Sequence, residues 1–314
     1  MEPRNSDLLK QLKVRFWYEG VRIRAKTATR YELEQLIESA RTPKSTTIYK
    51  NKWSSYEKGK HIPNSTLVDF VDHKYPGTAL EMNHPIWCSL ALKTPVEFKR
   101  LEALFTVLEP KVKKFIYHPI TESLPVQKRR KASFQLLWRL LKIGNMDALT
   151  ALILYWHEAS NDSDSSLPTL SKREIAQFIY KLLVSFGSVM YLRGLDRLMF
   201  KVVSEYIFKQ TDWQNQYVGI DDESYQIIWK AFEGVIEILP SNMSRQQKVI
   251  RIFDYRYGDT YPAAFNMLLM PQFEFGPPSP KEYNQWACQW KKWCWAWMLI
   301  RIETADDAMR LKPV

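Results

Sequence analysis

The stretch Trp53-Ser-Ser-Tyr-Glu-Lys-Gly-Lys-His-Ile-Pro63 decides the fold expected for the front of this 314-residue chain. Its aromatic residues precede Gly59, and glycine ends helices because it adopts the left-handed conformation without steric cost. Pro63 and Ser65 then begin another helix, since proline and short hydroxyl side chains are typical of helix starts. That helix is expected to turn three apolar residues towards a core: Leu67, Phe70 and Val71.

Two more helices are expected upstream of this stretch. Thr29 and Glu32 have the spacing of a capping box, in which the hydroxyl and the carboxylate each accept a backbone N–H of the other residue. The helix that they begin continues through Leu33, Leu36 and Ile37. An earlier helix is expected to be lined by Leu12, Phe16, Tyr18 and the residues from Val21 to Ile23.

These segments together resemble the Cro/CI-type (XRE) helix-turn-helix family. In that family the recognition helix and its turn read apolar-Ser-x-aromatic-Glu-x-Gly-Lys-x-x-Pro, as residues 53–63 do here, and a helix with an early leucine follows. The resemblance covers roughly residues 10–75. The chain departs from the pattern at Glu34, where the family usually has alanine. It departs again at Ser39–Thr46, a longer connection that lacks the family's glycine.

The resemblance implies a recognition helix of about Thr46–Lys58 in the major groove of DNA. It implies base-edge contacts from the early residues Thr46, Thr47, Tyr49 and Lys50. It also implies phosphate contacts from Lys44, Lys52, Ser55, Lys58 and Lys60, with Arg30 as a further DNA-binding residue. The alternative reading of the same segment is a helical module whose lysines form a solvated face.

The positive charge is concentrated where this motif lies. Residues 1–60 hold 14 Lys and Arg against 7 Asp and Glu, and residues 61–140 hold 12 against 7. The remaining residues, 141–314, hold 19 against 20. Positive charge concentrated in one part of the chain favours attraction to a polyanion, of which DNA and RNA are the commonest.

A second basic cluster follows the motif in the sequence. It comprises Lys111, Lys113, Lys114, Lys128, Arg129, Arg130 and Lys131. The cluster is a candidate clamp on a nucleic-acid backbone, and equally a solvated loop before a helix.

A tryptophan stripe is expected near the C-terminus, because its residues are spaced by four, three and four along one helix face. The stripe consists of Trp286, Trp290, Trp293 and Trp297. Helical spacing favours packing within the chain or against a partner, and a base-stacking platform is the alternative. We therefore expect self-association or a protein partner through the C-terminal half.

Other classes of protein find little support. Three cysteines form no disulfide framework, which suits a reducing cytoplasm, and the apolar run 293–300 is too short to cross a bilayer. No nucleotide loop, serine-nucleophile motif or spaced His/Cys metal motif occurs, so no cofactor, metal or catalytic residue is predicted. An enzyme with an unmarked site, such as a nuclease, stays open as an alternative.

Helix signals dominate the rest of the chain, so the predicted fold class is all-α. Further capping boxes are read at Thr94–Glu97, Ser171–Glu174 and Ser279–Glu282, with Pro95 and Pro280 as first helical residues. The expected order is a helix-turn-helix-like domain over 1–76, a Pro-rich basic connector over 77–131 and an irregular helical bundle over 132–314.

The function expected from these features is non-catalytic DNA binding by a cytoplasmic regulator of the bacterial or mobile-element type. The C-terminal domain would serve self-association or partner docking. The alternative is a structural or adaptor subunit of a larger assembly, such as a bacterial defence complex.

Overall fold

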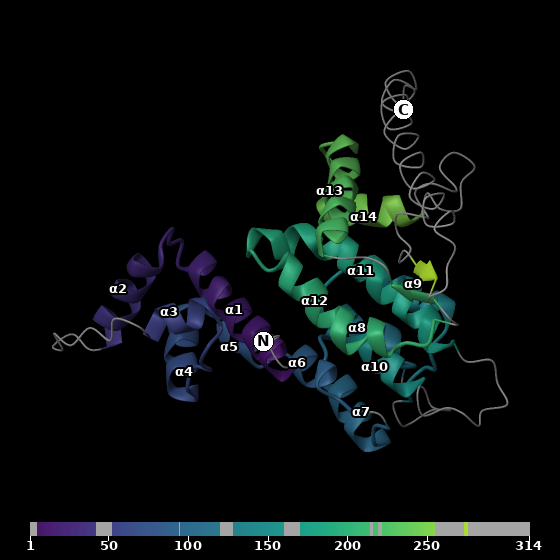
Figure 1. Ribbon diagram of the computed structural model, residues 1–314, viewed down its shortest axis with the longest axis horizontal. Helices are drawn as coiled ribbons and strands as arrows, with labels where there is room; N and C mark the ends of the chain where they lie inside the picture. Colours follow the sequence, from purple (N-terminus) through teal and green to yellow (C-terminus); the bar gives the residue numbers. More distant parts are fainter. Residues whose placement is uncertain are drawn as a thin grey trace. The chain divides into compact units, whose positions relative to one another are not determined.

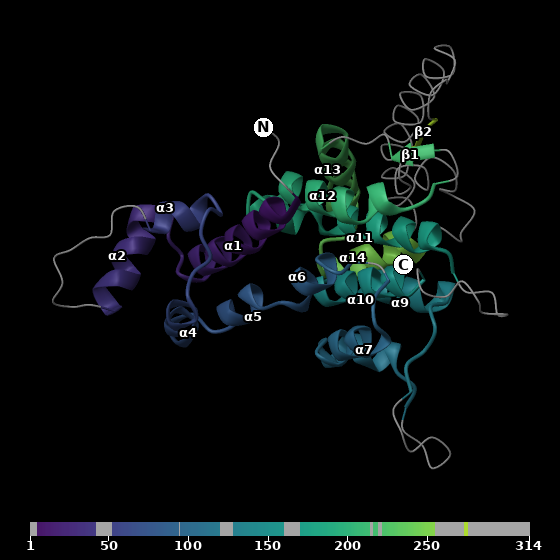
Figure 2. The ribbon, with the colours of Figure 1, turned by 60° about the horizontal axis from the view of Figure 1, so that its bottom comes forward.

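The computed structural model describes residues 5–41, 52–93, 95–119, 128–159, 170–213, 216–218, 222–254 and 273–275 (Figure 1). Those residues are predominantly helical, which confirms the predicted all-α class. The described strands are β1 (Gln216–Val218) and β2 (Phe273–Phe275), which pair antiparallel with Gln216 opposite Phe275. Figure 2 shows the same elements after a 60° turn.

The chain forms two compact units, residues 1–93 with 189–206, and residues 94–188 with 207–314. Unit 1 contains the helices α1 (Asn5–Arg24), α2 (Arg30–Arg41), α3 (Lys52–Glu57), α4 (Ser65–Lys74), α5 (Thr78–Met82), α6 (Pro85–Leu90) and α12 (Asp196–Tyr206). Unit 2 contains α7 (Phe98–Thr106), α8 (Pro110–Ile116), α9 (Phe134–Ile143), α10 (Met146–Glu158), η1 (Phe208–Gln210), α13 (Asp222–Ile238) and α14 (Arg245–Asp254). The chain passes from unit 2 to unit 1 within α11 (Lys172–Leu192).

An aromatic cluster from α1 and α3 forms the centre of unit 1. Trp17 and Trp53 are fully buried and stacked, with ring centroids 6.1 Å apart and planes at 17°. Tyr56 meets both rings edge-on, at 5.7 Å from Trp17 and 5.6 Å from Trp53. Large aromatic side chains contribute most of the apolar area in such cores, so this cluster ties α3 firmly to α1.

The predicted lining of α1 is confirmed at four positions and wrong at one. Leu12, Phe16, Tyr18 and Val21 are at most 5% exposed, whereas Ile23 is 45% exposed. Residues two apart on a helix point to nearly opposite sides, so burial of Val21 turns Ile23 outward.

The predicted turn after α3 is present in detail. Gly59 has φ +68°, its N–H donates to the Tyr56 carbonyl at 2.9 Å, and the Lys60 N–H donates to the Ser55 carbonyl at 2.8 Å. This pair of bonds is the Schellman ending of a helix. A Cβ at Gly59 would lie 2.7 Å from the backbone oxygen of Gln11, so the position needs glycine for space as well as for conformation.

The helix after this turn begins where it was predicted, at Ser65. Its cap is Asn64, whose side chain accepts the Leu67 N–H at 2.9 Å. Leu67 and Val71 are fully buried, and Phe70 packs against the core while partly buried. The predicted core face of this helix is therefore confirmed.

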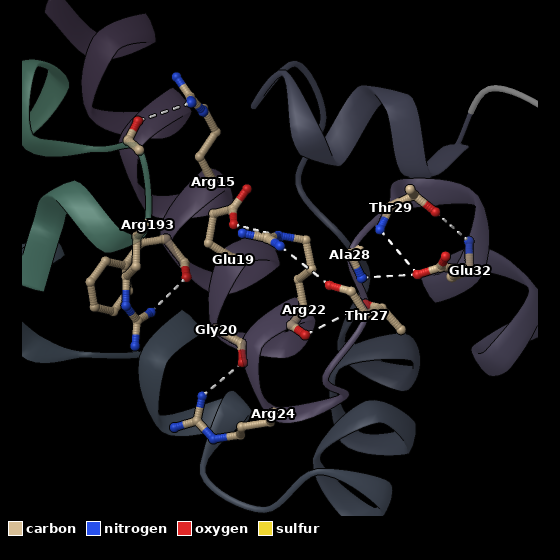
Figure 3. Close-up of polar contacts among 12 residues, drawn as sticks. Arg15, Glu19, Gly20, Arg22, Arg24, Thr27, Ala28, Thr29, Glu32 and Arg193 are labelled. Atoms are coloured by element: carbon tan, nitrogen blue, oxygen red, sulfur yellow. Dashed lines mark hydrogen bonds and ion pairs between the residues drawn. The ribbon is translucent and has the colours of Figure 1, made fainter.

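Two of the predicted capping boxes are confirmed. The Glu32 N–H donates to Thr29 Oγ1 at 3.2 Å, and the Thr29 N–H donates to Glu32 Oε2 at 3.2 Å (Figure 3). Ser171 and Glu174 form the same reciprocal bonds at 3.3 and 2.8 Å. The box predicted at Ser279–Glu282 lies outside the described residues.

The start predicted for α7 is wrong. Pro95 does not begin a helix, because Glu97 is extended and its carbonyl accepts the first helical bonds from Arg100 and Leu101. The helix therefore starts three residues later than the box at Thr94–Glu97 indicated. Proline occupies the first helical turn in α6 and α8 instead, at Pro85 and Pro110.

A segment from the middle of the chain belongs to unit 1. The guanidinium of Arg193 lies 4.2 Å from the Phe16 ring, donates to the Phe16 carbonyl at 3.1 Å and pairs with Glu81 at 2.8 Å. Arg15 donates in turn to the Gly194 carbonyl at 3.3 Å (Figure 3). No local pattern in the sequence indicates that this segment packs with the N-terminal helices.

The described helices of the predicted connector 77–131 are shared between the two units. Helices α5 and α6 belong to unit 1, and α7 and α8 belong to unit 2, with the division after Lys93. The three predicted domains stay a prediction. Among the described prolines of this region, Pro85 and Pro110 begin short helices and Pro95 lies between α6 and α7.

Unit 2 is built around α10, in which ten consecutive residues from Ala148 to His157 are buried. A helix that is buried all round is the core element of a larger bundle. Helix α11 is long and apolar enough to span a membrane by length and composition alone, and 72% of its most apolar window is buried inside the protein.

Candidate nucleic-acid interface

Half of the predicted DNA-binding residues lie outside the described part of the chain. These are Lys44, Thr46, Thr47, Tyr49 and Lys50. The described residues place Arg30 at the start of α2, Lys52 and Ser55 on α3, and Lys58 and Lys60 on either side of Gly59. The recognition helix was predicted over residues 46–58. Within the described part of that range, the helix is α3, Lys52–Glu57.

Two of the predicted contacts are paired with carboxylates of unit 1. Arg30 Nη1 lies 3.1 Å from Glu57 Oε2, and Lys52 Nζ lies 3.5 Å from Glu38 Oε1. Both pairs join α2 to α3, and their side chains are 25–41% exposed. Ion pairs of this exposure contribute about 0–1 kcal/mol, so a phosphate group can compete for either cation.

Lys58 and Lys60 differ from those two residues. Both are exposed, and neither forms an ion pair with another described residue. The backbone that carries them is held by the Schellman bonds and by Gln11, whose amide lies 3.5 Å from the Lys58 carbonyl. The turn therefore presents two accessible cations from a fixed backbone.

Helix α2 turns a charged stripe towards α3. Arg30, Glu34 and Glu38 are spaced by four residues, which places them on one face. Glu34 is 8% exposed, and its Oε1 atom has no hydrogen-bond partner. Burial raises the pKa of the Glu34 carboxyl, Glu38 raises it further, and Arg30 and Lys52 oppose the shift.

This stripe was missed as a functional feature, although Glu34 was noted as a departure from the family pattern. The pattern that could have revealed it is one cation and two anions spaced by four residues on one helix, with Lys52 and Glu57 on the next helix. The sequence does not show which acidic residue pairs with which cation, because α2 and α3 meet only in the folded unit.

The structure brings the two runs of the second basic cluster together. Tyr117 and Arg129 form an antiparallel bridge, with the His118 N–H donating to the Lys128 carbonyl at 2.9 Å and the Arg130 N–H donating to the Ile116 carbonyl at 2.7 Å. The run 128–131 therefore lies beside the end of α8.

Arg129 itself is a correction to the predicted cluster, because it is not a surface cation. Its side chain is 7% exposed, pairs with Glu102 at 2.6 Å and with both oxygens of Glu158, and lies 4.4 Å from the Phe105 ring. Burial opposes the charge, but the hydrogen bonds to Glu158 and Glu102 and the charge of Glu158 outweigh it and raise the pKa of Arg129. The residue is a structural anchor.

The other residues of the second basic cluster either bond to backbone carbonyls or are exposed. Lys113 donates to the Thr106 carbonyl at 3.1 Å, and Arg130 Nε donates to the Tyr117 carbonyl at 3.3 Å. Lys111, Lys114, Lys128 and Lys131 are exposed. Alternation explains one of these positions, since Lys128 directly precedes the buried Arg129 at the bridge and therefore points outward.

The tryptophan stripe Trp286, Trp290, Trp293 and Trp297 lies outside the described residues, so its role stays a prediction. Among the residues that are described, no group of three His, Cys, Asp or Glu side chains could hold a metal ion. Comparisons with known protein families, with curated proteins and with solved structures found no match for this chain.

Proposed function

We propose that unit 1 binds duplex DNA through α3 and the turn that follows it. The observation that carries the proposal is the pair of exposed lysines, Lys58 and Lys60, held at the Gly59 turn. Trp53 and Tyr56 anchor the opposite face of the same helix in the core. A helix with one anchored face and cations at its end suits docking into a groove lined by phosphates.

The charge of unit 1 supports the proposal. Residues 1–93 and 189–206 hold 19 Lys and Arg against 12 Asp and Glu. Arg30 and Lys52 are held by exposed carboxylate pairs, and those weak bonds are exchangeable for phosphate contacts. The order of helices α1 to α4 and the Gly59 turn also agree with the helix-turn-helix resemblance.

The proposed protein is a non-catalytic regulator of the bacterial or mobile-element type that acts in the cytoplasm. This step rests on the resemblance, since a fold alone does not define a function. The proposed role of the C-terminal half, self-association or docking of a protein partner, rests on the tryptophan spacing in the sequence.

The test is a salt-titrated binding assay with a fluorescent random-sequence duplex of about 30 base pairs. The variant Lys58→Glu/Lys60→Glu is expected to weaken binding more than about tenfold at 0.1 M salt and to lower the salt slope by about 2. The matched control Lys93→Glu/Lys201→Glu makes the same charge change at exposed positions of unit 1 and should stay close to the parent protein.

Two results would count against the proposal. Equal loss in both variants would mean that net charge, and not the turn, attracts the DNA. No binding by the parent protein at low salt would remove DNA binding and leave the adaptor subunit as the better interpretation. Thermal melting of each variant confirms that the comparison is made between folded proteins.

A further inference from the structure

Exposed cations of unit 2 lie on both helices of the junction between α8 and α9. The guanidinium of Arg139 on α9 lies 5.8 Å from the ring of Phe115 on α8. Gln246 joins the other ends of the two helices, since its side chain contacts Lys111 Nζ at 3.3 Å and the Lys142 carbonyl at 3.5 Å. The two helices therefore run side by side, with cations along both.

The run 128–131 extends this surface beyond the end of α8. The bridge between Tyr117 and Arg129 fixes the run there, and the buried ion pairs of Arg129 hold it in place. We define the α8–α9 seam by five exposed cations: Lys111, Lys114, Lys128, Lys131 and Arg139.

The described segments that carry the seam cations hold no acidic residue of their own. The segments 110–116, 128–133 and 134–143 together contain nine Lys and Arg and no Asp or Glu. None of the five seam cations forms an ion pair with any residue that the structure describes. Glu102 and Glu158, the acidic residues in contact with the run 128–131, are paired with Arg129.

We infer that the α8–α9 seam is a second nucleic-acid-binding surface that holds the phosphodiester backbone without reading sequence. Four of the five seam cations are lysines, which offer point charges to phosphates, whereas base edges are read by rigid donor forks. The inference does not rest on the proposed function, because it concerns different residues in a different unit.

The surroundings favour nucleic acid over other anionic partners. Among large apolar side chains of these segments, Phe134 alone of those described is exposed, at 44%. Membrane-surface helices bury a broad apolar face, and protein interfaces have an apolar centre. A surface with five exposed cations and one exposed large apolar side chain suits a partner that presents phosphates.

The experiment compares two triple charge reversals in the full chain. The seam variant is Lys111→Glu/Lys114→Glu/Arg139→Glu. The control, Lys99→Glu/Arg100→Glu/Lys230→Glu, changes the charge equally at exposed positions of α7 and α13. Binding of a random-sequence 30-base-pair duplex and a 30-nucleotide single strand is measured from 50 to 300 mM salt, and circular dichroism checks the fold.

The seam variant is expected to bind at least about tenfold more weakly at 0.1 M salt, with a salt slope lower by 2 to 3, since each phosphate contact contributes about 0.9 to the slope of duplex binding. The control should change affinity less than about threefold and leave the slope unchanged. Similar behaviour of the two variants would overturn the inference.

The variant Lys58→Glu/Lys60→Glu separates this inference from the proposed function. Loss in the seam variant alone supports the seam and contradicts the proposed role of unit 1, whereas loss in the unit 1 variant alone does the reverse. Unchanged binding in both overturns both. Vesicles with 30% phosphatidylserine test the lipid alternative. If the seam variant loses binding to these vesicles but still binds DNA like the parent protein, the inference is also overturned.

Discussion

The α2–α3 face of unit 1 and the α8–α9 seam of unit 2 hold similar cations in opposite surroundings. At the first, Arg30 and Lys52 each have a carboxylate partner within 3.5 Å, and Glu34 adds a buried acid between them. At the second, five exposed cations lie on segments with no acidic residue. The comparison shows that a count of lysines and arginines does not locate a binding surface until their partners are known.

The comparison also changes the meaning of the charge asymmetry along the chain. Residues 94–140, which hold 10 Lys and Arg against 4 Asp and Glu, belong to unit 2 and not to the unit that contains the helix-turn-helix-like motif. The cationic part of the sequence is therefore divided between two units, and each unit can be tested on its own.

The largest effect is expected at Arg129, the anchor under the seam. Arg129→Gln should destabilise unit 2 by about 3–5 kcal/mol, because it leaves Glu158 and Glu102 without their cation in a partly buried site. The control Lys131→Gln, an exposed neighbour, should stay within about 0.5 kcal/mol. Urea denaturation measures both, and equal stabilities would show that Arg129 is an ordinary surface cation.

A smaller effect is expected at the turn that presents Lys58 and Lys60. Gly59→Ala should cost about 2–3 kcal/mol, because alanine must adopt φ +68° and its Cβ would meet the Gln11 backbone. Gly194→Ala, at φ +62° with no atom within 4 Å of its Cβ, should cost only about 1 kcal/mol. Thermal unfolding of the two variants gives the difference, and a larger cost at Gly194 would contradict the described packing of the turn.

The ion pairs between α2 and α3 predict that removing their carboxylates raises the affinity for DNA. Glu38→Gln/Glu57→Gln should strengthen DNA binding about three- to tenfold, since two pairs of up to about 1 kcal/mol no longer compete with phosphate. Glutamine keeps an oxygen that accepts the Trp53 Nε1–H, now 3.1 Å from Glu38 Oε1. Glu97→Gln/Glu237→Gln, at exposed sites in unit 2, is the control with the same change of charge, and an equal gain there would mean that net charge causes the effect.

The smallest effect concerns the pH dependence of stability at Glu34. A raised pKa in the folded state means that this carboxyl holds its proton more strongly when folded, so its contribution is greatest at acid pH and is lost as pH rises through the folded pKa. Glu34→Gln should therefore stabilise the protein at pH 7 by no more than about 1 kcal/mol, and the gain should disappear below about pH 4. A gain that is constant with pH would exclude titration of Glu34 as its cause.

Local signals explain why parts of unit 1 were predictable. The Gly59 ending, the Thr29–Glu32 box and the start of α4 depend on residues within six positions of one another, where backbone sterics and capping decide the outcome. The start of α7 was mispredicted because the same capping pattern also fits an extended segment ahead of a helix.

Contacts between distant residues explain what the sequence could not show. Arg129 and its neighbours Lys128 and Lys131 look alike in a basic run, and only the positions of Glu102 and Glu158 separate the anchor from the surface cations. Arg193 likewise joins unit 1 through Phe16, which lies 177 residues away.

The sequence by itself determined the all-α class, the helix boundaries around Gly59 and the concentration of positive charge, because propensity, capping and composition act over short distances. Only the tertiary structure decided which cations have carboxylate partners and which segments form each unit, because ion pairing and burial depend on side chains that meet after the chain has folded.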